Sequence, residues 1–207
     1  SLSGPLGETA GFRLNAYYAD REGHIDNLTL GTKVGGDDGF GVRGKFQWDP
    51  SDNLEVTLIG DYSERNTDGT ALTYRDVPAT AAFLGFLPFA AISAGITPGE
   101  ENFNTRLSED PTGEAEALSL TGRVVYNFGD FELTSITNYQ ESDYEFFADV
   151  DGTEFNVLGA LTMGAFSGGL TQGGPFSTEQ ISQEFRLSSS VGDNFEYLLG
   201  LFYADSD

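Results

Sequence analysis

Large apolar residues occupy every second position in several segments of this chain. Between 39 and 49, Phe40, Val42, Phe46 and Trp48 alternate with charged and polar residues, and the segment 54–63 repeats the pattern. A period of two is typical of a β-strand with one apolar and one polar face. Strands of about 10 residues are long enough to cross a bilayer obliquely, and β-structure crosses lipid only as a closed barrel.

Short turns and long loops alternate along the chain. The turns carry the Gly, Pro, Asn and Asp residues of tight hairpins, at 7–9, 49–53, 128–130 and 191–194. The long connections fall at about 22–38, 66–114 and 147–179. Outer-membrane barrels have short periplasmic turns and long extracellular loops. The pattern therefore predicts an all-β fold, an antiparallel transmembrane β-barrel segment of about eight strands. We expect these strands at 1–5, 10–21, 39–49, 54–65, 115–128, 131–146, 180–190 and 195–204.

The basic residues are sorted by strand face. Half of the 10 Lys and Arg residues have the parity of the polar, inward face: Arg13, Arg43, Lys45, Arg123 and Arg186. An arginine that faces lipid in mid-membrane costs about 2–4 kcal/mol, so a bilayer would enforce this sorting. Glu116 is an exception on the apolar face, at the loop end of its strand. A soluble β-sandwich also carries charge on its outer faces and remains the alternative.

Aromatic residues border the short turns, as in the interfacial girdle of a membrane barrel. They are Trp48, Phe128, Phe131, Phe195 and Tyr197. Aromatics also flank the turns of soluble hairpins, so these residues support the barrel without deciding it.

Composition narrows the possible partners. The 207 residues include 33 Asp and Glu against 10 Lys and Arg, for a net charge of −23, which disfavours nucleic acid as a partner. The chain has no cysteine, which excludes disulfides and thiolate metal sites. Both ends cut through the strand pattern, so we interpret residues 1–207 as part of one longer β-barrel domain.

Two uncharged runs lie in the long loops. Ala79–Ile96 is long enough for a membrane helix, but Pro88, Gly85 and Gly95 interrupt it. We expect short helical turns packed over the barrel mouth there. The run Val157–Leu170 contains four glycines and is interpreted as a pliable loop.

The longest loop supplies the candidate ligand-binding residues. They combine aromatic surface with one cation above a charged lumen: Tyr74, Arg75, Phe83, Phe86 and Phe89. The alternative is that this loop only shields the barrel mouth.

Catalytic chemistry is not indicated. His24, the sole histidine, lies in a polar loop with no nucleophile motif beside it, so we expect a surface residue. The acidic clusters at 37–38, 100–101 and 149–151 lack EF-hand spacing and are interpreted as solvated loop charge. We predict a protein that is not an enzyme, with no catalytic residue, metal site or cofactor.

Several segments, taken in order, resemble the barrel of TonB-dependent receptors. The segments are SGPL at 3–6, DREGHIDN at 20–27, GVRGKFQWDPS at 41–51, LTSITNY at 133–139, QEFRL at 183–187 and LGLFY at 199–203. The resemblance covers the chain apart from its two longest loops. His24 departs from it, because the family often has an aromatic residue there.

The resemblance implies a 22-stranded barrel with a plugged lumen in the outer membrane of a Gram-negative bacterium. It implies energised uptake of a scarce nutrient such as a ferric siderophore. The partners would be outer-membrane lipid, the plug domain of the full-length chain, the TonB complex and a small-molecule nutrient. The five inward cations would contact the plug or line the substrate path. The alternatives are a passive porin-like barrel and a secreted acidic β-sandwich that binds glycans.

Overall fold

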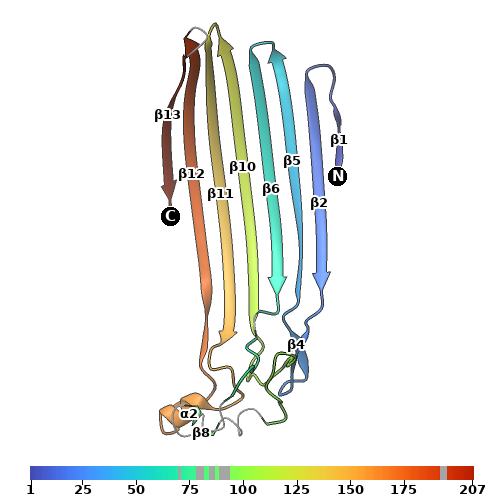
Figure 1. Ribbon diagram of the computed structural model, residues 1–207, viewed down its shortest axis with the longest axis vertical. Helices are drawn as coiled ribbons and strands as arrows, with labels where there is room; N and C mark the ends of the chain where they lie inside the picture. The colour runs from blue at the N-terminus through green and yellow to red at the C-terminus, as the bar shows by residue number, and fades with distance from the viewer. Residues whose placement is uncertain (70, 78–81, 84–86, 89–93, 192–194) are drawn as a thin grey trace.

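The chain forms one long antiparallel sheet in which consecutive long strands lie side by side. The computed structural model describes residues 1–207 except 70, 78–81, 84–86, 89–93 and 192–194. The eight strands follow the order β1-β2-β5-β6-β10-β11-β12-β13, and the sheet does not close, because β1 and β13 are its edges (Figure 1). The strand bounds are β1 Leu2–Pro5, β2 Ala10–Arg21, β5 Asp37–Ser51, β6 Leu54–Thr67, β10 Thr112–Phe128, β11 Phe131–Asp149, β12 Thr171–Val191 and β13 Phe195–Ser206.

The fold class and the number of long strands predicted from the sequence are confirmed, but several strands are longer than predicted. The largest difference is β12, which begins at Thr171 instead of residue 180. Residues 171–179 contain two glycines and a proline and show no apolar alternation. They nevertheless pair with Glu141–Asp149 of β11, which continues three residues beyond its predicted end. Backbone pairing, which needs no side-chain pattern, therefore extends both strands beyond the alternating segments.

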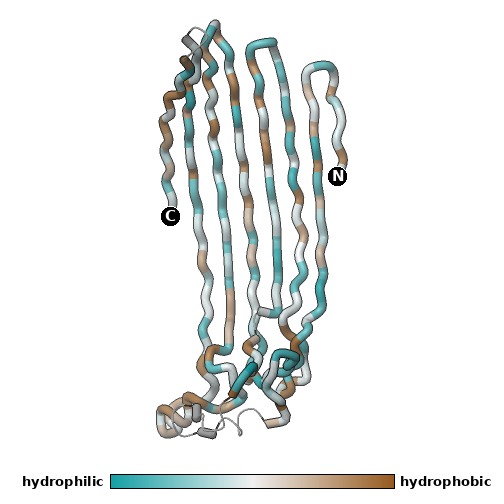
Figure 2. Tube along the Cα trace, in the orientation of Figure 1, coloured by the Kyte–Doolittle hydropathy of each residue, from teal (hydrophilic) through white to brown (hydrophobic). Residues whose placement is uncertain are grey.

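The register places the alternating residues on two faces of the sheet. Phe12 pairs with Phe46, Phe46 with Leu58, and Leu58 with Gly122, so these positions share one face. Arg13 pairs with Lys45 on the opposite face, where Arg43 also faces Asp61. Hydrophobic and hydrophilic residues alternate along parts of the strands in Figure 2. The division of these residues between two faces, as predicted from the sequence, is therefore confirmed, and we call the two surfaces the apolar face and the polar face.

The apolar face has the height of a membrane core. On β10 its residues run from Leu118 to Phe128, which is 10 residue steps along the strand. At about 3.3 Å per residue and a tilt of about 40°, this stretch spans about 25 Å, the height of the apolar band of a membrane barrel. Among the described residues, no helix is long and apolar enough to cross a membrane.

Tight turns at one end of the sheet carry aromatic rings. The turn between β10 and β11 consists of Gly129 and Asp130, and Gly129 adopts the left-handed φ of 64° that the turn requires. Phe128 stacks on Tyr126 at 5.7 Å and on Phe131 at 5.5 Å between ring centroids. These three rings form an aromatic border on β10 and β11 at this end of the apolar face.

The long connections fold together into a compact cap at the other end of the sheet. A three-stranded sheet, β4-β3-β9, joins the first connection to the second, and Ile25, Val34, Ala71 and Leu107 form its hydrophobic core. The third connection contains a helix. The bounds are β3 Ile25–Asn27, β4 Thr32–Val34, β7 Ala82–Phe83, β8 Leu87–Pro88, β9 Asn104–Thr105 and α2 Val157–Leu161.

One expectation for the loops differs from the structure. The run at 157–170 is not simply a pliable loop, because α2 begins there and Val157 is only 2% exposed. Its local pattern was too short and too rich in glycine to reveal contacts made with the rest of the cap. The helical turns expected in Ala79–Ile96 fall mostly outside the described residues, and the part that is described contains the antiparallel pair β7–β8.

Candidate functional site

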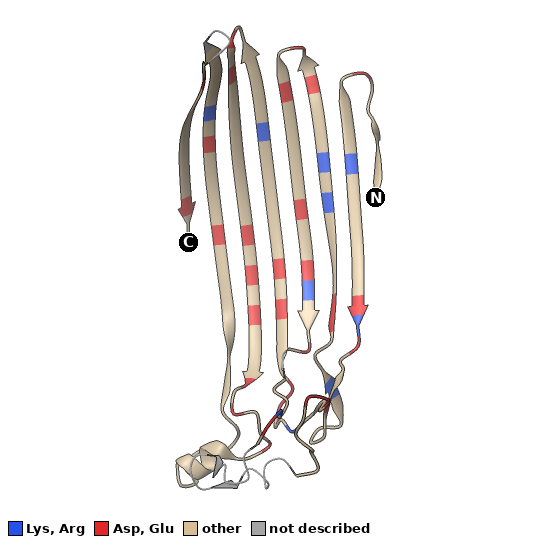
Figure 3. Cartoon of the chain, viewed as in Figure 1, with Lys and Arg blue, Asp and Glu red and all other residues tan. Residues whose placement is uncertain are grey.

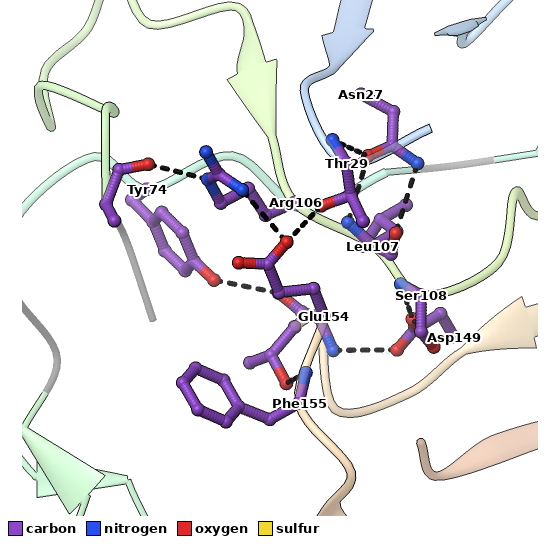
Figure 4. A network of polar contacts seen from close by, with 12 residues as sticks. Asn27, Thr29, Tyr74, Arg106, Leu107, Ser108, Asp149, Glu154 and Phe155 are labelled. Atoms are coloured by element: carbon purple, nitrogen blue, oxygen red, sulfur yellow. Dashed lines mark hydrogen bonds and ion pairs between the residues drawn. The ribbon is translucent and has the colours of Figure 1, made fainter. Parts of the chain in front are cut away.

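Asn27 links the first and second connections at the centre of the cap. Its side chain is 1% exposed and makes four hydrogen bonds (Figure 4). The amide oxygen accepts from the backbone N–H groups of Leu107 at 3.1 Å and Thr29 at 3.2 Å. The amide nitrogen donates to the carbonyl of Leu107 at 3.3 Å and to Asp110 at 2.8 Å. This buried side chain thus uses its full hydrogen-bonding capacity, and three of its four hydrogen bonds reach residues 80 or more positions away.

Glu154 and Asp149 tie the third connection to the same cap. One carboxylate oxygen of Glu154 accepts from Arg106 at 2.9 Å and from the Thr29 hydroxyl at 2.7 Å. Asp149 accepts from the backbone N–H of Ser108 at 3.0 Å and from its hydroxyl at 3.1 Å. All three connections are therefore cross-linked by polar contacts, which hold the cap in one arrangement over the end of the sheet.

The acidic cluster at 149–151 is part of this framework, which corrects its interpretation as solvated loop charge. Asp149 is 9% exposed, and Asp151 accepts from Thr153 and from the backbone N–H of Leu170. Burial and the neighbouring Asp151 raise the pKa of Asp149, although its hydrogen bonds from Ser108 and Gly152 oppose this shift. Its charge was visible in the sequence, but the groups that bury it come from another loop.

Two of the candidate ligand residues contact the cap backbone. The Tyr74 hydroxyl donates to the carbonyl of Gly152 at 2.8 Å, and burial raises the pKa of Tyr74. Arg75 donates to the carbonyl of Glu100 at 3.0 Å while its side chain stays exposed. Phe86 and Phe89 lie outside the described residues, as does the side chain of Phe83 in β7. Their role in ligand binding remains a prediction.

The five inward cations divide into two groups. Three are paired with carboxylates on the polar face: Arg43 with Asp61 at 3.3 Å, Arg123 with Glu55 at 2.7 Å, and Arg186 with Glu184 at 2.6 Å. Arg13 and Lys45 lie directly opposite each other on β2 and β5, and neither has an ion-pair partner in the described part of the chain. Both line a hollow whose floor includes Ser3 and Gly11.

The apolar face carries more carboxylates than the single exception expected from the sequence. Glu64, Glu116 and Asp143 occupy one row across β6, β10 and β11, and Glu114 and Glu145 occupy the next. Acidic residues concentrate on the loop side of the sheet, as Figure 3 shows. Strand parity alone could have identified Glu64, but only the register aligns these residues into rows above the apolar band.

Within the described ranges, no group of three or more His, Asp or Glu side chains could hold a metal ion.

His24 remains on the surface, where its ring meets Phe103 edge-on with 6.1 Å between ring centroids. No function is indicated by this contact.

Solved structures match the sheet and the cap together. The ferric yersiniabactin uptake receptor FyuA from Yersinia pestis superposes with a TM-score of 0.69 over 99% of this chain, at 17% sequence identity. The ferric-catecholate import receptor Fiu from E. coli K12, in an open form, gives 0.68 over 99%, at 11% identity. The fold is that of a TonB-dependent receptor's barrel wall.

This chain spans less than a third of either receptor, 27% of FyuA and 31% of Fiu. No protein-family model matches it, and a search of curated proteins finds no significant relative. At these identities the likeness establishes the fold. In membrane β-barrels in general, the apolar strand face is the outer one and the polar face lines the interior.

Proposed function

We propose that this chain is part of an outer-membrane TonB-dependent receptor that takes up a scarce nutrient, such as a ferric siderophore, in a Gram-negative bacterium. The observation that carries the proposal is an open eight-stranded sheet with an apolar band about 25 Å high. Two siderophore-type uptake receptors share its fold over 99% of its length. In this role the protein is a transporter and not an enzyme.

The polar face would meet a plug domain supplied by the full-length chain. Like charges directly opposite each other destabilise a sheet, so Arg13 beside Lys45 favours an acidic group placed between them. Arg43, Arg123 and Arg186 are already paired within the wall and would line the substrate path. Energy would come from the TonB complex acting on segments beyond this wall.

The cap would make the first contact with the nutrient. Its polar network holds the connections in place, and Tyr74 and Arg75 belong to that framework. The exposed part of Arg75, with Phe83, Phe86 and Phe89 from the same loop, would supply the capture surface. Rigid framing of a loop reduces the entropy lost when a ligand binds to it.

The full-length protein should restore growth on a ferric siderophore to a bacterium that lacks its own siderophore receptors. Accumulation of radio-iron should require TonB, and a matched strain without TonB is the control. Uptake that persists without TonB would instead support the passive porin-like barrel. A full-length protein that stays in solution without detergent would contradict both the TonB-dependent receptor and the porin-like barrel.

A further inference from the structure

The polar face becomes shallow just below the cap, because small residues occupy three adjacent strands. Gly41 pairs with Ser63, and Ser63 pairs with Ala117, which places all three in one row. Gly39 and Ala115 belong to the next row toward the cap. A hollow of about 420 Å³ lies over part of this floor. We call the polar surface over these two rows the trough.

Three aromatic rings form one wall of the trough. Tyr144 pairs with Ala115 on one side and with Phe176 on the other, which places both rings on the polar face. Phe146 lies two residues after Tyr144 in β11, so its ring is on the same face. The ring centroids of Tyr144 and Phe146 are 5.7 Å apart, and those of Phe146 and Phe176 are 5.8 Å apart. The ring planes differ by only 15° and 12°, and Tyr144 and Phe176 are 44% and 59% exposed. A flat aromatic surface is thus presented to the barrel interior.

Tyr17 limits the trough on the other side. A Cβ atom added to Gly41 would collide with its ring, so this ring lies directly over the glycine. Tyr17 on β2 and Tyr144 on β11 are four strands apart, which corresponds to about 19 Å along the wall at about 4.8 Å per strand. Neither hydroxyl has a hydrogen-bond partner among the described residues. Both walls therefore offer a ring and a free polar group.

Guanidinium groups lie within the same rows. Arg65 occupies the position between Gly39 and Ala115, and its side chain is 62% exposed while it contacts Asp37 at 3.2 Å. Arg43 lines the hollow beside Tyr17, and its side chain is 57% exposed. Each cation pairs with one carboxylate among the described residues, and more than half of its side chain is exposed.

We propose that the trough binds a ligand that carries planar aromatic rings with polar substituents. Its rings stack on Tyr144, Phe146 and Phe176, since aromatic pairs attract beyond the area that they bury. Its polar substituents accept hydrogen bonds from Arg65 and from the free tyrosine hydroxyls. The Tyr17 ring covers the floor at Gly41, and the small residues Ser63, Ala115 and Ala117 leave room for a bulky molecule between the walls. This inference rests on the proposed uptake function and narrows its substrate to the aromatic, catecholate-like class of iron chelates.

The test compares two iron chelates on the full-length receptor in outer membranes. One probe is a radio-iron-labelled ferric tris-catecholate, and the other is a ferric trihydroxamate with an aliphatic backbone and no aromatic ring. The double variant Tyr144→Ala, Phe176→Ala removes the wall, and Ala117→Trp fills the floor without touching the wall. Phe40→Ala, which removes an exposed ring from the apolar face near the same height, is the control. Heat-dependent gel mobility verifies that every variant is folded.

We expect the wild-type receptor to prefer the catecholate. Both trough variants should weaken its binding at least tenfold, while Phe40→Ala and the conservative change Tyr144→Phe should retain most of it. Preference for the trihydroxamate, or catecholate binding that survives both trough variants, would overturn this inference and leave the uptake function in place. In that case the rings pack against other parts of the barrel. A wild-type receptor that binds neither chelate would overturn the uptake of ferric chelates, and the inference with it.

Discussion

Replacement of Leu58 by arginine should prevent stable insertion of the barrel, whereas the same change at Ile59 should be tolerated. The two positions are consecutive in β6 and both are aliphatic, so the pair isolates the effect of the sheet face. Leu58 lies on the apolar face between Phe46 and Gly122, and it is 51% exposed in this wall. Ile59 lies on the polar face opposite Lys45.

The magnitude follows from the position of Leu58 in the apolar band. The apolar residues of β6 run from Leu54 to Tyr62, and Leu58 is four residues from each. Four steps of about 3.3 Å at a tilt of about 40° place it about 10 Å from either edge, close to the midplane. An arginine there costs about 2–4 kcal/mol, and loss of the leucine side chain from lipid costs about 1.5–3 kcal/mol more.

Ile59→Arg has a much smaller cost because its side chain enters the water-accessible interior. Lys45 lies opposite, and repulsion between like charges across a strand pair costs up to about 1 kcal/mol. Asp61, two residues further on the same face, offsets part of this repulsion. The net difference between the two variants is therefore about 3 kcal/mol or more, which is over a hundredfold in the folding equilibrium.

The assay is heat-dependent gel mobility of the full-length protein in outer membranes, followed by denaturant unfolding in lipid vesicles. Leu58→Arg should yield little of the compact, heat-sensitive band, and Ile59→Arg should yield nearly the wild-type amount. Equal amounts of the compact band for both variants would refute the assignment of the faces to lipid and lumen.

Three further predictions concern the cap and its position. Asn27→Ala removes four hydrogen bonds and leaves their buried partners unsatisfied, so the cap should lose about 2–4 kcal/mol of stability. Limited proteolysis should then cleave the cap while the strands stay protected, and an unchanged digestion rate would contradict this. Ser167→Cys should react with an impermeant maleimide on intact cells and Asp52→Cys only after the outer membrane is opened; the reverse result would invert the topology. Asp149 has a raised pKa in the folded cap, so its ionisation costs more there than in the unfolded loop. Its contribution to cap stability is therefore fully present below the unfolded pKa of about 3.9 and is lost as the pH rises through the raised folded value. Proteolysis of the cap should report this loss, and Asp149→Asn should flatten the pH dependence; a variant with the wild-type pH profile would contradict it.

The sequence alone was sufficient for the architecture of the wall. Alternation with a period of two depends only on the pleat of a strand, so residues such as Phe46 and Lys45 reveal their faces without knowledge of their neighbours. The turn residues Gly129 and Asp130 likewise act locally. The placement of the five cations on the polar face followed from the same rule, because parity is fixed once the strand is located.

Contacts between distant segments could not be predicted from such local patterns. The extension of β12 to Thr171 depends on its pairing with β11, and the burial of Asp149 depends on Ser108 from another loop. Nothing in the sequence around Asn27 predicts that the backbone N–H of Leu107, 80 residues away, will donate a hydrogen bond to its side chain. A local pattern carries no information about which loop will supply the partner.

The trough shows most clearly which features the sequence determines and which depend on the tertiary structure. The sequence determined that Gly41, Ala117 and Tyr144 lie on the polar face of their strands, because strand parity is a property of each strand alone. Only the register between strands decided that the glycine and alanine form one floor and that Tyr144 and Phe176 stand side by side above it. Register is set by hydrogen bonds across the whole sheet, so a binding surface built from several strands exists only in the tertiary structure.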